Sequence, residues 1–128
     1  MIEYIYHNIP GNPQWRGSFY ERLAEDGEWD IDEFWRLHFA LIEAAKNPAA
    51  SENINRSLAL NVVQIHLRVS GLICAHFDNN DVFKIENLSR EEIYAFKERL
   101  DLAVAGVFSG EVLPESSFDL KCPNTKNA

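Results

Sequence analysis

A short polar segment in the second half of the chain gathers side chains that could do chemistry. The segment HFDNNDVFKIENL spans residues 76–88, and its first six residues hold one histidine, two aspartates and two asparagines. Imidazole nitrogens and carboxylate oxygens bind divalent metals and also act as general acids and bases. Aspartate and asparagine are turn formers too, because their side chains hydrogen-bond to the nearby backbone. The segment therefore predicts either a chemical site or a corner of the fold.

Counting positions from Asp78 tests the segment as a calcium loop. An EF-hand needs an oxygen ligand at position 5, glycine at position 6 and glutamate at position 12. Those positions hold Val82, Phe83 and Ser89, so the calcium loop is excluded. Asp78 and Asp81 could still hold a cation weakly as a pair. The simpler interpretation is a reversal between two helices, with residues 82–85 forming a short connection or a very short strand.

The rest of the sequence gives little support to catalysis. The four histidines, at positions 7, 38, 66 and 76, include no pair at the i, i+4 spacing of a helical zinc site. The chain has no phosphate-binding glycine loop and no Gly-x-Ser-x-Gly sequence. We therefore predict a protein that is not an enzyme and uses no metal and no cofactor. The alternative is a small helical metal-dependent enzyme, in which His38, His66 or His76 converges with carboxylates.

The charge of the chain bears on its partners. Twenty acidic residues stand against twelve lysines and arginines, which gives a net charge of −8. Such a surface repels phosphate backbones and anionic lipids, so we expect no nucleic-acid partner and no membrane partner. A basic protein partner is favoured instead. The N-terminus lacks the pattern of a signal peptide, and polar residues interrupt the apolar stretch 58–77, so we expect a cytoplasmic protein.

Acidic residues are densest between Glu21 and Glu33, where seven acids accompany a single base, Arg22, and surround Trp29. One interpretation is an acidic rim around a tryptophan that binds a partner. The other is a solvated acidic face beside a tryptophan that is buried against the following helix. From charge alone, we predict the first six of the following as contact residues and the last three as secondary candidates: Glu25, Asp26, Glu28, Trp29, Asp30, Asp32, Asp78, Asp81 and Glu86.

Helix start and stop signals predict the elements that carry these residues. Capping residues precede apolar patterns of helical period, and glycine or proline follows them. We expect an all-α single domain over residues 1–113, with a flexible tail over residues 114–128. Its about four main helices lie near residues 19–26, 31–46, 56–77 and 90–108, after a short extended segment over residues 2–7.

The third of these helices is apolar nearly all round, so we expect it to be the central buried helix. Gly71 interrupts it, which predicts close contact with a neighbouring helix or a mild bend.

Two blocks of the sequence resemble a known family. The first is Trp29-Asp30 with EFWRL at residues 33–37, and the second is HFDNNDVFKIENL continuing through EEIY at 91–94 to FSGE at 108–111. Both lie within residues 15–113, and together they resemble the small immunity proteins of bacterial polymorphic-toxin and contact-dependent growth-inhibition systems.

The resemblance implies a non-enzymatic protein that binds a cognate toxin domain, one-to-one, in the cytoplasm of the producing cell. Many of those toxins are basic nucleases, which would suit the acidic charge of this chain. The resemblance supplies no contact residues, because toxin-binding surfaces vary among such proteins. A helical adaptor or regulatory domain without a toxin remains a further alternative.

Overall fold

The computed structural model describes residues 1–46 and 53–114, and it confirms the all-α prediction. No strand occurs in these two ranges, and the helices pack together as one bundle. The tail expected over residues 114–128 lies outside the described residues, apart from Pro114. The helices are α1 (Glu3–His7), α2 (Phe19–Asp26), α3 (Ile31–Lys46), α4 (Arg56–Phe77) and α5 (Arg90–Ser109).

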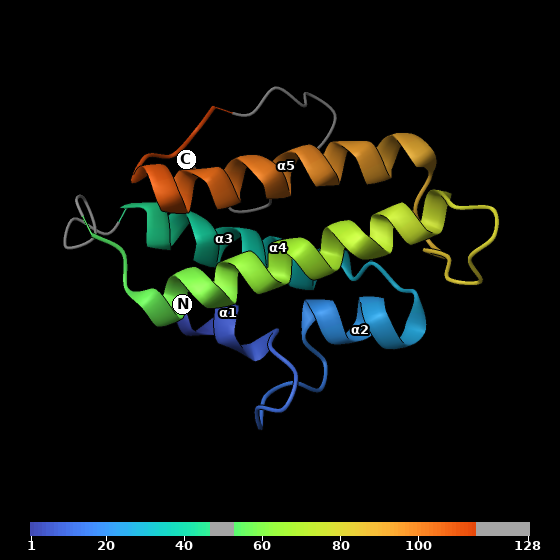
Figure 1. The fold of residues 1–128 in the computed structure, drawn as a ribbon, viewed down its shortest axis with the longest axis horizontal. Helices are drawn as coiled ribbons and strands as arrows, with labels where there is room; N and C mark the ends of the chain where they lie inside the picture. The colour runs from blue at the N-terminus through green and yellow to red at the C-terminus, as the bar shows by residue number, and fades with distance from the viewer. Residues whose placement is uncertain (47–52, 115–128) are drawn as a thin grey trace.

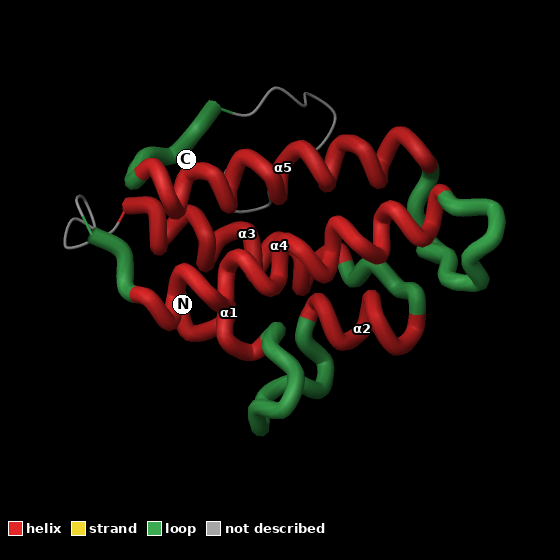
Figure 2. The backbone as a smooth tube through the Cα atoms, viewed as in Figure 1, coloured by secondary structure: helices red, strands yellow, loops and turns green. Residues whose placement is uncertain are grey.

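The bundle is arranged around an aromatic core. In Figure 1, α4 crosses in front of α3, with α5 along one side and the two short helices α1 and α2 along the other. Figure 2 shows the long loop that joins α4 to α5 at one end of the bundle. Both α3 and α4 contact α5, α1 and α2. Between the helices, five rings lie with centroids 4.8–5.7 Å apart, namely Phe19, Trp29, Phe34, Trp35 and Phe96.

Burial of α4 differs from the expectation of an all-round buried helix. Its buried residues, Val62, Ile65, Val69 and Ile73, follow helical spacing along one face, whereas half of the 16 residues of α3 are buried. Of the two expectations for Gly71, close contact with a neighbouring helix is not met, because nothing in the described chain lies within 4 Å of where its Cβ would be, and the mild bend stays a prediction. Apolar composition alone does not tell which faces of a helix its neighbours cover.

By length and composition, α4 is also the single helix in the described ranges that could cross a membrane. Core helices of soluble proteins meet the same criteria, so one such helix is weak evidence.

The N-terminal segment is helical rather than extended, which corrects the sequence-based expectation. Residues 3–7 form α1, and its buried side chains, Tyr4 and Ile5, are adjacent in sequence. Two buried asparagines hold this short helix. The Asn8 amide donates to the Tyr4 carbonyl at 2.9 Å and accepts from the Tyr20 N–H at 2.9 Å, while the Asn12 amide donates to carbonyls near the end of α1. These tertiary contacts override the weak local pattern.

The predicted helix ends are confirmed. Ser18 accepts from the N–H of Glu21 at 3.2 Å, and Ser89 with Glu92 forms a complete capping box. Gly27 and Gly110 end α2 and α5 in the left-handed region, with φ of 65° and 77°. Local capping chemistry therefore determines where these helices begin and end.

Candidate functional site

The turn between α2 and α3 is tied to the loop between α4 and α5. The Glu86 N–H donates to the Gly27 carbonyl at 2.8 Å. The next residue of the loop, Asn87, pairs with Trp29. The Trp29 N–H donates to Asn87 Oδ1 at 2.9 Å, and Asn87 Nδ2 donates to the Trp29 carbonyl at 2.8 Å. The packing is tight, since a Cβ on Gly27 would lie 2.5 Å from the Lys84 carbonyl oxygen. These contacts place two segments that are far apart in sequence side by side.

The loop itself is built by the aspartates of the segment HFDNNDVFKIENL. Asp78 Oδ1 accepts from the Asn80 N–H at 2.9 Å, and Asp81 Oδ1 accepts from the Phe83 N–H at 2.8 Å. The Lys84 ammonium donates to the carbonyls of Asp78 and Asp81 at 3.3 and 3.0 Å. The prediction of a corner between two helices is confirmed, because each aspartate forms a turn through its own neighbouring backbone.

The histidines have separate partners. His76 Nδ1 accepts from the N–H of Ile85 at 2.9 Å, while His66 Nε2 lies 2.8 Å from an Asp101 carboxylate oxygen. His38 is buried and packs against the rings of Phe34 and Trp35. Ten residues separate His66 from His76 on α4, which is about 15 Å along the axis. Among the residues that the structure describes, no three His, Cys, Asp or Glu side chains are grouped to hold a metal ion.

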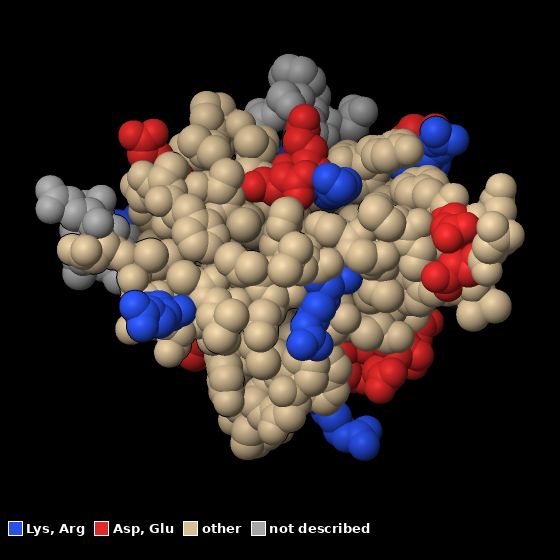
Figure 3. Space-filling model, in the orientation of Figure 1, with Lys and Arg blue, Asp and Glu red and all other residues tan. Residues whose placement is uncertain are grey.

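The tied loops gather the predicted acidic residues at one end of the bundle, which we call the acidic end. In Figure 3, acidic atoms cluster where α2 ends and where the loop after α4 lies. Arg22 lies 3.4 Å from carboxylate oxygens of both Glu28 and Asp30, and Asp30 also caps α3 by accepting from the Glu33 N–H at 3.1 Å. The exposed members of the acidic end are Glu25, Asp26, Glu28, Asp32, Asp78, Asp81 and Glu86, and Asp30 is half-buried.

Trp29 is not part of this surface, which decides between its two sequence-based interpretations. Its side chain has 0% exposure and packs against Phe19, Phe34 and Phe96, with ring centroids 4.9–5.5 Å away. The prediction of Trp29 as a contact residue is therefore wrong. An aromatic residue beside a helix cap is more strongly drawn into the core than toward its acidic neighbours, because burial of a large ring contributes more than a surface charge.

Val82 is the residue at the acidic end that the charge pattern did not single out. Its side chain is 98% exposed at the tip of the loop, while Ile85 is 3% exposed and anchors the same loop. The signal was present in the alternation of residues 82–85, in which Phe83 and Ile85 face inward and Val82 faces outward. An exposed apolar side chain in a loop with acidic residues can contribute apolar contact to a protein-binding surface.

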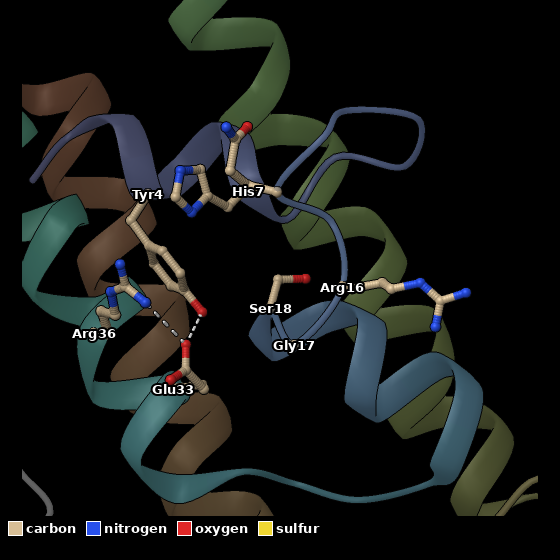
Figure 4. A pocket seen from close by; sticks show the side chains of 8 residues that line it. Tyr4, His7, Arg16, Gly17, Ser18, Glu33 and Arg36 are labelled. Carbon is tan, nitrogen blue, oxygen red and sulfur yellow. Dashed lines mark hydrogen bonds and ion pairs between the residues drawn. The ribbon is translucent and has the colours of Figure 1, made fainter.

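A recess lies between α1, α3 and the segment that precedes α2 (Figure 4). The Tyr4 hydroxyl donates to Glu33 and accepts from the Phe19 N–H at 3.1 Å, and the Arg36 guanidinium lies 4.1 Å from the centre of the Tyr4 ring. Burial and the hydrogen bond to Glu33 raise the pKa of Tyr4. The recess has a volume of about 270 Å³. It is lined by Tyr4, His7, Gln14, Arg16, Gly17, Ser18, Glu33 and Arg36.

The groups in this recess satisfy one another. Arg36 Nη1 lies 3.5 Å from Glu33 Oε1, and Figure 4 shows the Arg16 side chain pointing away from Tyr4 and Glu33. The charges on α3 are thus paired within the recess, and the hydroxyl of Tyr4 joins α1 to α2 and α3. We interpret the recess as a structural joint of the N-terminal segment.

Comparisons with protein-family models, curated proteins and solved structures find no match for this chain. The resemblance to immunity proteins rests on the two sequence blocks alone. The structure brings those blocks into contact, since Trp29 belongs to the first and Asn87 to the second. Their contact lies at the acidic end.

Proposed function

We propose that this chain is an immunity protein that binds a basic toxin domain through its acidic end and neutralises it. One observation carries the proposal: two acidic segments, residues 25–32 and 78–86, are held side by side by hydrogen bonds, and the second carries the exposed apolar residue Val82. Concentrated charge of one sign attracts a partner of the opposite sign and speeds its association. The two blocks of resemblance to immunity proteins support the same assignment.

The acidic end is suited to rapid binding because its backbone is already ordered. The hydrogen bonds of Asn87, Asp78 and Asp81 hold both loops before a partner arrives. A surface that is ordered in the free protein loses less conformational entropy on binding. Val82 then supplies an exposed apolar contact in the same loop as Asp78, Asp81 and Glu86.

Neutralisation follows from competition for the same cationic groups. A nuclease domain binds its substrate through lysine and arginine side chains that contact phosphates. Carboxylates held on a rigid protein surface can occupy those side chains and exclude the nucleic acid. We expect a one-to-one complex, because the described residues form one such acidic end in each chain.

The proposal is tested with the product of the gene immediately upstream. We expect its C-terminal domain to co-purify with this chain, to bind it tightly at low salt, and to arrest growth when it is expressed without this chain. Co-expression of this chain should restore growth. Absence of binding at low salt, together with growth that does not depend on this chain, would refute the proposal.

A pair of matched double variants tests the contact surface. Glu25→Lys with Glu86→Lys reverses two exposed charges of the acidic end, whereas Glu3→Lys with Glu111→Lys makes the same charge change at exposed positions elsewhere. Long-range attraction contributes factors of about 10 to 10³ to association rates, so we expect the first variant to associate at least about tenfold more slowly at low salt. Equal rates for the two variants would remove the acidic end from the interface.

A further inference from the structure

The outward face of α4 carries an apolar stripe that nothing in the described chain covers. Leu60, Val63 and Leu67 are 55%, 40% and 64% exposed. Gly71 and Cys74, also exposed, continue the line at intervals of four and three residues. The intervals of three, four, four and three residues place all five positions on one face of the helix. At 22 residues, α4 offers a seam about 33 Å long.

This stripe is also the place where a second acidic molecule meets the least repulsion. The chain has a net charge of −8, yet α4 has no aspartate or glutamate among its 22 residues. In Figure 3, the face over α4 is largely uncharged, in contrast to the acidic end. Like charges oppose self-association, so a contact between copies is most favourable on this face.

Gly71 points to close approach by another helix. Glycine in the middle of a helix lowers stability relative to alanine, and its usual reason is a neighbour that leaves no room for a Cβ. Within the described chain, no atom lies within 4 Å of that position. Within the described residues, no neighbour therefore requires the absence of a Cβ at Gly71, and Gly71 lies in line with the exposed stripe.

We propose that two copies of this chain pair through α4, antiparallel, about a two-fold axis at Leu67. In this register, the residue numbers of two positions that face each other across the seam add to 134. Leu60 therefore faces Cys74 of the second copy, and Val63 faces Gly71. Leu60 and Val63 each meet a smaller residue, which lets the two stripes interdigitate on both sides of the axis. The axis places Leu67 against its own copy.

Charge complementarity fixes the same register at both ends of the seam. The exposed residues Arg56, at the start of α4, and Asp78, just after its end, also add to 134 and therefore face each other. Each arginine then lies beside the C-terminal end of the opposite α4, and each aspartate beside the N-terminal end, which favours both charges. Asp78 meets the seam at the margin of the acidic end, so the dimer leaves the rest of that surface open in each copy.

The oligomeric state of the full chain tests the proposal without any toxin. Sedimentation velocity over a range of concentrations should show a reversible dimer. Leu67→Asp should raise the dimer dissociation constant at least about tenfold, because it places two like charges on the axis. Val82→Asp, at an even more exposed apolar residue off the stripe, should leave it unchanged. A monomer at all concentrations, or equal effects of the two variants, would overturn the proposal.

A cross-link tests the register. In a Cys122→Ser background, Leu60→Cys should form a disulfide with Cys74 of the second copy when treated with oxidised glutathione, which accepts the two electrons and two protons released by the thiols. Arg68→Cys, on another face of α4, should form none. In the same background, Arg56→Asp should weaken the dimer, and adding Asp78→Arg should restore it. A dimer that fails these tests would refute the antiparallel seam.

A membrane is the competing occupant of the stripe. Vesicles of phosphatidylcholine with phosphatidylglycerol should not sediment the wild-type chain. A chain that stays monomeric and binds these vesicles, but loses binding with Leu67→Asp, would assign the stripe to lipid and overturn the dimer.

Discussion

The side-chain amide of Asn87 pairs with the backbone of Trp29 as one peptide group pairs with another. Its oxygen accepts from the Trp29 N–H at 2.9 Å and its nitrogen donates to the Trp29 carbonyl at 2.8 Å, across 58 positions of sequence. The pairing satisfies both backbone groups of a residue whose ring lies in the core. The pairing therefore fixes the backbone just before the start of α3, and it fixes the two acidic segments relative to each other.

Loss of this pairing should destabilise the fold. Asn87→Ala leaves the N–H and carbonyl of Trp29 without their partners, and we expect the free energy of unfolding to fall by about 1–3 kcal/mol. Asn79→Ala, at an exposed position in the same loop, should change it by less than about 0.5 kcal/mol. Urea denaturation followed by tryptophan fluorescence measures both, and a similar small change for the two variants would contradict the role given to Asn87.

Gly27 should be far less tolerant of alanine than Gly17. Both have positive φ, 65° and 81°, but a Cβ at Gly27 would lie 2.5 Å from the Lys84 carbonyl oxygen and a Cβ at Gly17 would meet nothing within 4 Å. Gly17→Ala isolates the cost of the left-handed backbone, about 1 kcal/mol. Gly27→Ala adds the clash and should cost at least about 1 kcal/mol more. Equal losses in urea denaturation would show that the two loops separate easily.

The sequence predicted the four helices α2, α3, α4 and α5 well because their signals are local. Ser18, Asn55 and Ser89 act through the next three residues, so a capping pattern read from the chain is realised in the fold. The helix α1 was missed because five residues are too few for a periodic pattern, and its stability comes from Asn8 and Asn12.

The site was only partly predictable, because its residues meet through long-range contacts. The charge pattern found the acids of residues 25–32 and 78–86, but nothing local indicated that Asn87 would join these segments. It also left Trp29 undecided between core and surface, since an acidic neighbourhood is compatible with both. Burial depends on what the rest of the chain places opposite a residue, as the one-sided burial of α4 also shows.

Val82 should matter for partner binding and not for folding. Because its side chain is 98% exposed, Val82→Ser should change the free energy of unfolding by less than about 0.5 kcal/mol. Ile85→Ala, in the same loop but 3% exposed, should cost about 2–4 kcal/mol. With the upstream toxin domain, calorimetry should show weaker binding by Val82→Ser than by the wild type. Unchanged affinity would place the loop tip outside the interface.

Tyr4→Phe should destabilise the joint between α1, α2 and α3 at neutral pH. The change removes the donor to Glu33 and the acceptor of the Phe19 N–H, which is buried. We expect a loss of about 1–3 kcal/mol in the free energy of unfolding. Urea denaturation at pH 7 and pH 8 should give the same difference from the wild type, because tyrosine is protonated in both states at these pH values.

Above pH 10 that difference should shrink, and the direction follows from the pKa of Tyr4. Burial and the hydrogen bond to Glu33 raise this pKa in the folded protein above its ordinary value of about 10. As the pH rises through the ordinary pKa of about 10, Tyr4 ionises in the unfolded chain while it stays protonated in the folded one. The unfolded state is therefore favoured, and the advantage of the wild type over Tyr4→Phe should fall by about 1.4 kcal/mol per pH unit. Urea denaturation of both proteins between pH 9 and pH 11 measures this slope, and a constant difference would mean that the Tyr4 hydroxyl is not held as the structure shows.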